Sequence, residues 1–211
     1  MSSLSLLEAL PPVQRLALAY APARAREPTL ALLALDTRLA GIVRNSHEPS
    51  LAQLRLAWWR EQLRVPAAEW PRGEPLLMAL RSWQGRHVAL AALVDGWEYL
   101  TGAAPLPDAD MLAFAAGRGE AFAALADVVG AGHEAAARLG RRWALADLAA
   151  NVSNAQERQV AARLLAAEAR PPRVARALRP LAVLHGLALR RPGSAPTLTV
   201  LAALRLGLLG R

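Results

Sequence analysis

The feature that most constrains the fold is a pair of amphipathic helices predicted between Arg24 and Glu61, with a proline break between them. Apolar side chains of the first helix recur at spacings of three and four residues, as on one helical face: Leu32, Leu35, Leu39 and Ile42. Pro49 and Ser50 then supply a break and a cap for the second helix. Three of its apolar side chains share a face: Leu51, Leu54 and Trp58. The two helices predict a helical layer early in the chain.

The adjacent indoles of Trp58 and Trp59 cannot point in the same direction on a helix. We therefore expect one ring to lie in the core and the other to line the wall of a cavity. Asp95 and Glu98 are three residues apart on a later predicted helix. They could hold a cation, and ordinary surface charge is the preferred interpretation.

Composition extends the helical prediction to the whole chain. Of the 211 residues, 54% are hydrophobic and 20% are charged, which allows a sizeable core and argues against global disorder. Alanine and leucine dominate and β-branched residues are few, which favours helix over strand. We predict an all-α, single-domain helical bundle over residues 1–211, with about eight to ten helices.

The positions of proline and glycine set the predicted helix boundaries. Besides the first pair, helices are predicted over residues 4–20 with a break at Pro11-Pro12, and over 75–83, 87–101, 109–129, 133–152, 156–168, 173–191 and 197–209. Residues 20–28 are expected to form a loop, and Asp108 to cap the helix that follows it. Gly117 and Gly119 lie inside the helix over 109–129 and indicate close helix contact or a kink, since glycine weakens helices.

The sequence contains no lysine, so arginine supplies all of the positive side-chain charge, and the formal net charge is +8. A solvated basic surface is the preferred interpretation, and an anionic membrane surface or a diphosphate is an alternative. No nucleic-acid partner is predicted, because the arginines are spread along the chain and no basic motif with interleaved aromatic residues appears.

The chain contains no cysteine, which excludes disulfides and thiolate chemistry. The N-terminal residues lack the pattern of a signal peptide, and no apolar run reaches the roughly 20 residues that span a bilayer. We therefore expect a cytoplasmic protein that contacts a membrane, if at all, at its periphery.

No established catalytic or metal-binding pattern is present. The four histidines have no ligand spacing and are expected at the surface or at helix ends: His47, His87, His133 and His185. The nucleophile-elbow, P-loop and dinucleotide-binding motifs are also missing from the sequence. From its residues alone, the chain therefore predicts no catalytic residue and no metal ligand.

One stretch does resemble a known family. Residues 30–61, and above all Arg55-Leu-Ala-Trp-Trp-Arg-Glu61, resemble the first part of the squalene/phytoene synthase family, which carries the motif R-L-x-W-W-R. Residues 114–130 and 139–151 are similar to two later helices of that family. The resemblance implies an isoprenoid (terpenoid) synthase type of fold. In the family, two acidic motifs on facing helices bind Mg²⁺ ions that hold prenyl diphosphates.

Both acidic motifs are lost here. The resemblance places the first on Ala40, Gly41 and Arg44. It places the second on Asn151, Asn154 and Ala155. None of these residues is acidic, so the resemblance implies a truncated or degenerate cavity without cofactor.

The missing acids favour a catalytically inactive protein with a binding or assembly role, similar to the branch of mitochondrial complex I assembly factors. Such a protein implies a protein partner or an isoprenoid or lipid ligand, and peripheral contact with the inner face of a membrane is compatible with it. We expect five residues to line its cavity: Tyr20, Arg24, Arg44, Arg55 and Trp58. The alternative is an active prenyl diphosphate transferase of the squalene or phytoene synthase type, which would need Mg²⁺. It would have to use displaced acids: Asp36, Asp95, Glu98 and Asp147.

Overall fold

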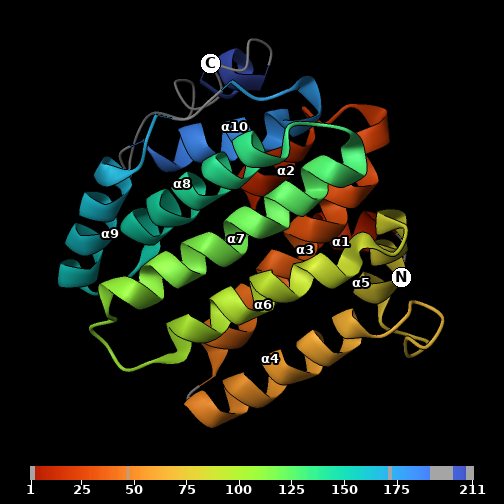
Figure 1. Ribbon diagram of the computed structural model, residues 1–211, viewed down its shortest axis with the longest axis horizontal. Coiled ribbons are helices and arrows are strands. Elements are labelled where there is room, and N and C mark those ends of the chain that lie inside the picture. The colour runs from red at the N-terminus through yellow and green to blue at the C-terminus, as the bar shows by residue number, and fades with distance from the viewer. Residues whose placement is uncertain (1–2, 47, 171–172, 191–201, 208–211) are drawn as a thin grey trace.

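The long helices of the protein pack side by side around one continuous hydrophobic core, as the computed structural model in Figure 1 shows. The structure describes residues 3–46, 48–170, 173–190 and 202–207. Within these residues it contains helices and no strand, which confirms the all-α prediction.

The α-helices follow one another with short connections. In chain order they are α1 (Ser3–Ala9), α2 (Pro12–Leu18), α3 (Ala23–Asn45), α4 (Pro49–Arg64), α5 (Pro75–Leu80), α6 (Ala91–Glu98), α7 (Asp108–Val129), α8 (His133–Asn151), α9 (Ala155–Ala167) and α10 (Arg179–Ala188). Short 3₁₀ helices are η1 (Arg81–Trp83), η2 (Arg86–Leu90), η3 (Tyr99–Thr101) and η4 (Arg176–Leu178). Residues 202–207 are also helical, and the rest of the helix predicted over 197–209 lies outside the described residues.

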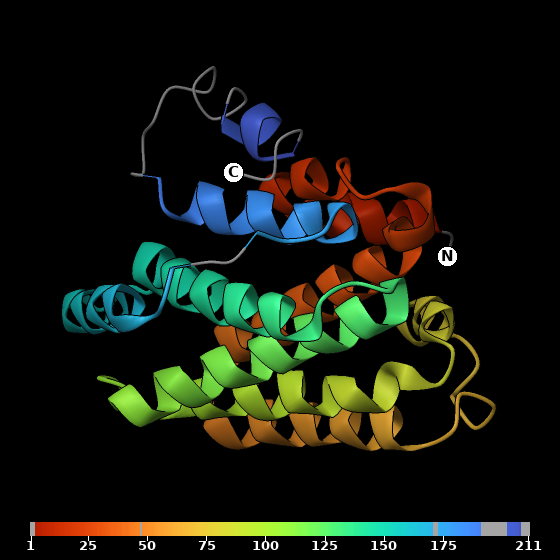
Figure 2. The same ribbon diagram turned by 45° about the horizontal axis from the view of Figure 1, so that its top comes forward.

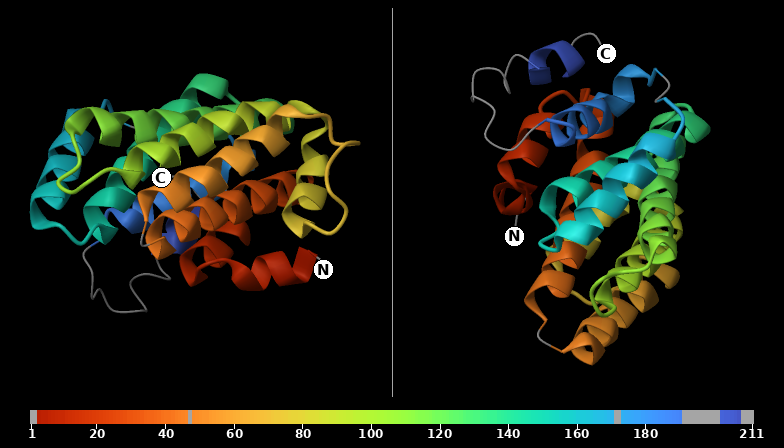
Figure 3. Two further views of the ribbon diagram at one scale, coloured as in Figure 1. Left: turned by 90° about the horizontal axis from the view of Figure 1, so that it is seen from below. Right: turned by 90° about the vertical axis from the view of Figure 1, so that its left-hand side faces the viewer.

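Five helices form a row that organises the molecule. Figure 2 shows α4, α6, α7, α8 and α10 stacked in this order, with each helix in contact with the next. Helix α3 crosses this row and contacts α4, α5, α6 and α7. The two views of Figure 3 place α1 and α2 beside α3, at the margin of the row. The row therefore meets the N-terminal helices in two places, through α3, which contacts α1 and α2, and through α10, which contacts α2.

Helix α3 buries the face that its periodicity predicts. Leu32, Leu35 and Leu39 are almost fully buried. The helix begins earlier than expected, because residues 23–28 are helical and do not form a loop. Pro28 lies inside the first turns, and its carbonyl accepts a hydrogen bond of 3.1 Å from Trp83 Nε1. This hydrogen bond ties the first turns of α3, where the proline lacks an N–H to donate, to Trp83 of η1.

Helix α4 is buried through a face different from the apolar one in its sequence. Its buried side chains are Ala52, Leu56, Trp59 and Leu63. Leu51, Leu54 and Trp58 are instead 46%, 69% and 39% exposed, so their shared face points away from the core. Trp59 is 3% exposed, which confirms that one indole of the pair is a core residue.

Close approach of three helices depends on glycine. A Cβ atom at Gly117 of α7 would lie 2.3 Å from the carbonyl oxygen of Ala92 in α6. On the other side, a Cβ at Gly119 would lie 2.8 Å from the carbonyl oxygen of Ala137 in α8. The predicted close contact is therefore confirmed, and it brings α6, α7 and α8 together.

Three predicted boundaries need correction. Pro49 and Ser50 are the first two residues of α4, and Glu48 precedes them in the cap position. Asp108 is the first helical residue of α7, and Pro107 precedes it in the cap position. Pro180 lies in the first turn of α10 and not inside a longer helix, because the turns before it form η4. A proline in a first turn leaves no helical hydrogen bond unmade.

Two of the histidines are buried, contrary to the expectation of surface positions. His87 is 3% exposed and its Nε2 lies 3.2 Å from the carbonyl oxygen of Val65. His185 in α10 is 6% exposed and its Nε2 has no hydrogen-bond partner in the described structure. Burial, and then the charge of Arg142, lower the pKa of His185 from 6.5 to about 4.

The buried His185 makes stability depend on pH. Between pH 6.5 and pH 4 the unfolded chain binds a proton at this site that the folded chain does not bind, so acidification favours unfolding. From pH 7 to pH 5 we expect this group to lower the free energy of unfolding by about 2 kcal/mol. Urea unfolding of the wild type and His185→Gln at both pH values measures it. Equal pH dependence of the two proteins would contradict the prediction, and replacement of the exposed His133 by glutamine should leave the loss in place.

Candidate functional site

Three helices direct charged side chains to one buried point. Asp36 lies on the inner face of α3, between Leu32 and Leu39, and is 3% exposed. Arg118 lies on α7 between the two glycines that allow close packing, and it is 2% exposed. Asp147 lies on α8, and its side chain is 32% exposed. A cation thus lies in the core between one buried and one partly exposed carboxylate.

The guanidinium of Arg118 binds both carboxylates. Its Nη2 lies 3.0 Å from Oδ2 and 3.2 Å from Oδ1 of Asp36, and its Nε lies 3.3 Å from the same Oδ1. Its Nη1 donates to Oδ2 of Asp147 at 2.9 Å. This geometry uses the planar fork of arginine, which suits two acceptors on different sides.

Aromatic rings enclose the guanidinium. Its central carbon lies 4.1 Å from the ring centroid of Trp143, 4.7 Å from that of Phe114 and 5.3 Å from that of Trp97. Trp97 also donates a hydrogen bond of 2.8 Å from Nε1 to Oδ1 of Asp36. The rings exclude water and favour the cation over their faces, so the site is filled by the chain's own side chains.

Electrostatics keep this arginine charged. Burial alone would lower the pKa of Arg118, and the charges of Asp36 and Asp147 raise it above its ordinary value. Burial raises the pKa of Asp36, against the opposing effect of Arg118. On the solvent side, Asn151 Nδ2 donates to Oδ1 of Asp147 at 2.8 Å. Asp36 therefore depends on Arg118 more than Asp147 does, because Asp36 is only 3% exposed while Asp147 is partly exposed and also binds Asn151.

The positions of the lost acidic motifs lie near this cluster on α3 and α8. Ala40, one turn after Asp36, is buried, and Arg44, a further turn along, is exposed. On α8, Asn151 binds Asp147 as described, and Asn154 caps α9 by accepting hydrogen bonds from the amides of Gln156 and Glu157. Each of the two asparagines thus has a structural role of its own.

The other two displaced acids lie elsewhere. Asp95 and Glu98 on α6 both pair with Arg60 of α4, with Nε of Arg60 2.5 Å from Oδ1 of Asp95. Their side chains are 48% and 36% exposed, in agreement with surface charge. In the part of the chain that the structure describes, no group of three histidine or acidic side chains could hold a metal ion.

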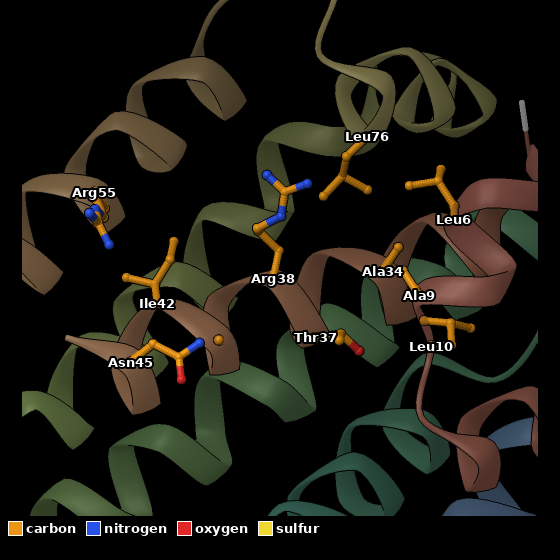
Figure 4. A pocket seen from close by; sticks show the side chains of 11 residues that line it. Leu6, Ala9, Leu10, Ala34, Thr37, Arg38, Ile42, Asn45, Arg55 and Leu76 are labelled. Atoms are coloured by element: carbon orange, nitrogen blue, oxygen red, sulfur yellow. The ribbon is translucent and has the colours of Figure 1, made fainter. Parts of the chain in front are cut away.

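A groove runs along the opposite side of α3 from Asp36. It has a volume of about 350 Å³, and Figure 4 shows it between α1, α3, α4 and α5. A second hollow of about 260 Å³ adjoins it and shares Arg38, Ile42 and Arg55. Trp58 lines the second hollow together with Trp59.

The five residues predicted to line a cavity are only partly brought together. Arg55 and Trp58 both line the groove region. Tyr20 packs against Gly207, while Arg24 and Arg44 are exposed and are not among the lining residues. Gly41, one of the positions of the lost motif, also lines the groove.

The sequence reasoning missed Arg118 as the central residue, although it noted the two glycines beside it. The signal was present: Arg118 is the lone charged residue in the otherwise apolar run 111–119 of α7. A charged residue in such a run faces the core of a packed helix, where it requires an acidic partner.

The class of protein is an all-α bundle, consistent with the predicted isoprenoid synthase type of fold, in which an arginine of α7 joins a carboxylate of α3 to a carboxylate of α8. The squalene/phytoene synthase family model matches residues 15–113, which supports that family for the part of the chain from α2 to the start of α7. The match includes Asp36 and the Arg55–Glu61 segment and ends before Arg118 and Asp147. Neither a curated protein nor a solved structure matches the chain. No helix of the described residues is long and apolar enough to cross a membrane.

Proposed function

We propose that this protein is a catalytically inactive relative of squalene and phytoene synthases, with a binding or assembly role. One observation carries the proposal: the guanidinium of Arg118 lies within hydrogen-bond distance of both Asp36 and Asp147. On α3 and α8, these two acids lie one turn before Ala40 and Asn151, which are positions of the lost motifs. The guanidinium of Arg118 thus supplies the positive charge that a bound Mg²⁺ ion would otherwise supply to these two carboxylates.

The chemistry of the family explains why this substitution supports an inactive protein. Release of an allylic diphosphate needs several carboxylates that hold Mg²⁺ ions against the diphosphate oxygens. Here Ala40, Arg44 and Ala155 provide none. A divalent ion could reach Asp36 only by displacing Arg118, and the displaced guanidinium would remain a buried charge without its partners.

If the protein acts through a protein partner, the proposed role is one in assembly, as in the branch of complex I assembly factors. The exposed face of α4 formed by Leu51, Leu54 and Trp58 supports a partner or a membrane surface. The net charge of +8 suits an anionic membrane face. A cytoplasmic protein held at the periphery of the inner membrane fits both features.

The alternative, an active prenyl diphosphate transferase, is favoured by one feature. Asp36 and Asp147 come from facing helices and converge on one cation. If Arg118 swung out of the core, the same two carboxylates would be available to Mg²⁺.

Turnover separates the two functions. We expect purified protein to release no diphosphate from farnesyl or geranylgeranyl diphosphate, with or without Mg²⁺, and to show no metal-dependent rise in melting temperature. Release that requires Mg²⁺ and is lost in Asp147→Asn would contradict the proposal. A variant with Ala40→Asp, Arg44→Asp, Asn151→Asp and Ala155→Asp tests whether the acidic positions alone restore metal binding.

A further inference from the structure

The groove between α1, α3, α4 and α5 combines two arginines with an apolar wall. Figure 4 shows Arg55 near one end, Arg38 in the middle, and Leu6, Leu10 and Leu76 around the other end. Its main hollow of about 350 Å³ lies within the size range of small-molecule sites. The groove therefore has a cationic part and an apolar part along one axis.

The cationic part is not neutralised by the groove's own walls. None of its described lining residues is acidic. Arg55 makes no hydrogen bond or ion pair with the described residues. Arg38 is 46% exposed, with Nη1 3.5 Å from Oε2 of Glu74 and its central carbon 5.7 Å from the ring centroid of Trp59, and no other hydrogen bond of its side chain is formed with the described residues. Two guanidinium groups on one groove favour a phosphate or a carboxylate.

The apolar part of the groove suits an alkyl chain attached to such an anionic group. Ala34 and Asn45 mark the extent of the groove along α3, which corresponds to about 16 Å at the helical rise per residue. Leu6 and Leu10 of α1 and Leu76 of α5 close the end beside Ala34. An alkyl chain whose head group lies at the arginines would remove these apolar atoms from water.

We propose that this groove binds an amphiphilic anion: a single alkyl chain that ends in a phosphate or a carboxylate. The head group pairs with Arg38 and Arg55, and the chain lies along α3 towards Leu6, Leu10 and Leu76. The inference names a ligand for the proposed binding role and rests on that role. It places the ligand on the outer side of α3, away from Asp36 and Arg118.

Gly41 offers a test that does not disturb packing. It lines the groove, and a Cβ built on it meets no atom within 4 Å. The variant Gly41→Leu should therefore fill the groove while the fold is kept or stabilised, because leucine favours helix over glycine. Arg55→Gln removes one of the two cations, and Arg64→Gln, at the exposed end of the same helix α4, is the matched control.

Isothermal titration and melting temperature with four probes test the proposal. Octyl phosphate and octanoate carry both parts of the ligand, inorganic phosphate lacks the chain, and octanol lacks the charge. We expect saturable binding of at least one of the two anions with a chain, and binding at least about tenfold weaker for the other two probes. Arg55→Gln should weaken binding about tenfold, Gly41→Leu should abolish it, and Arg64→Gln should leave it unchanged.

Three results would overturn the inference. The first is that neither octyl phosphate nor octanoate binds, and the second is that binding is unaffected by Gly41→Leu and Arg55→Gln. The third is sedimentation with vesicles of phosphatidylcholine and phosphatidic acid without binding of either monomer, which would assign the arginines to a membrane surface. Failure of the inactive role is seen separately, as prenyl diphosphate turnover, and would leave binding in the groove unaffected.

Discussion

Replacing Arg118 with leucine is expected to lower the free energy of unfolding by about 3–5 kcal/mol. The leucine would fit among the rings of Trp97, Phe114 and Trp143, so lost packing is a small part of the effect. The larger part is the carboxylate of Asp36, which is 3% exposed and would keep only the hydrogen bond from Trp97. A buried charge without its partner is the most destabilising outcome for such a site.

Denaturant unfolding of two further proteins shows whether charge is the cause. Adding Asp36→Asn to Arg118→Leu should recover more than half of the loss, since the amide oxygen still accepts from Trp97. Arg163→Leu removes an arginine that pairs with Asp108 at 2.6 Å but is 65% exposed, and it should cost less than about 1 kcal/mol. If Asp36→Asn fails to rescue, the loss comes from packing and the buried ion pair is not its source.

Replacing Gly117 with alanine is expected to be the second most costly single change, at about 3 kcal/mol. The added methyl carbon would lie 2.3 Å from the carbonyl oxygen of Ala92, and backbone cannot rotate away as a side chain can. Helices α6 and α7 would have to separate. Because α6 carries Trp97 and α7 carries Arg118, their separation would also lengthen the contacts around Asp36.

The matched control for this change is Gly41→Ala in α3. Its methyl group would meet open space, so we expect a gain of up to about 1 kcal/mol from helix propensity. Thermal and urea unfolding of both variants gives the comparison. Equal effects of the two alanines would contradict the view that close contact between α6 and α7 explains Gly117.

The ion pair changes how the core of such a bundle is held together. In the family that the chain resembles, facing acidic motifs are joined through bound metal ions. Here α3, α7 and α8 are joined through one guanidinium, at distances of 2.9 to 3.3 Å. The same cluster therefore explains both the expected loss of stability in Arg118→Leu and the proposed lack of prenyl transfer.

Helical periodicity predicted most of the secondary structure correctly. The inner face of α3 and the glycine contacts of α7 follow from the spacing of residues in the sequence. The apolar face of α4 is the exception: Leu51, Leu54 and Trp58 are exposed, because the neighbouring helix α6 packs against the face that carries Leu56 and Trp59. Spacing reveals that a face is apolar, and only the arrangement of neighbours decides whether it is covered.

The sequence alone determined the all-α architecture and the absence of acids at Ala40, Arg44 and Ala155, since both depend on residue type and local spacing. The tertiary structure alone decided that Asp36 and Asp147 meet, and that Arg118 lies between them. Asp36 and Arg118 are 82 positions apart in the chain, and Arg118 and Asp147 are 29 positions apart. Pairing across such distances depends on how whole helices pack, because a buried charge selects its partner in space and leaves no periodic trace in the sequence.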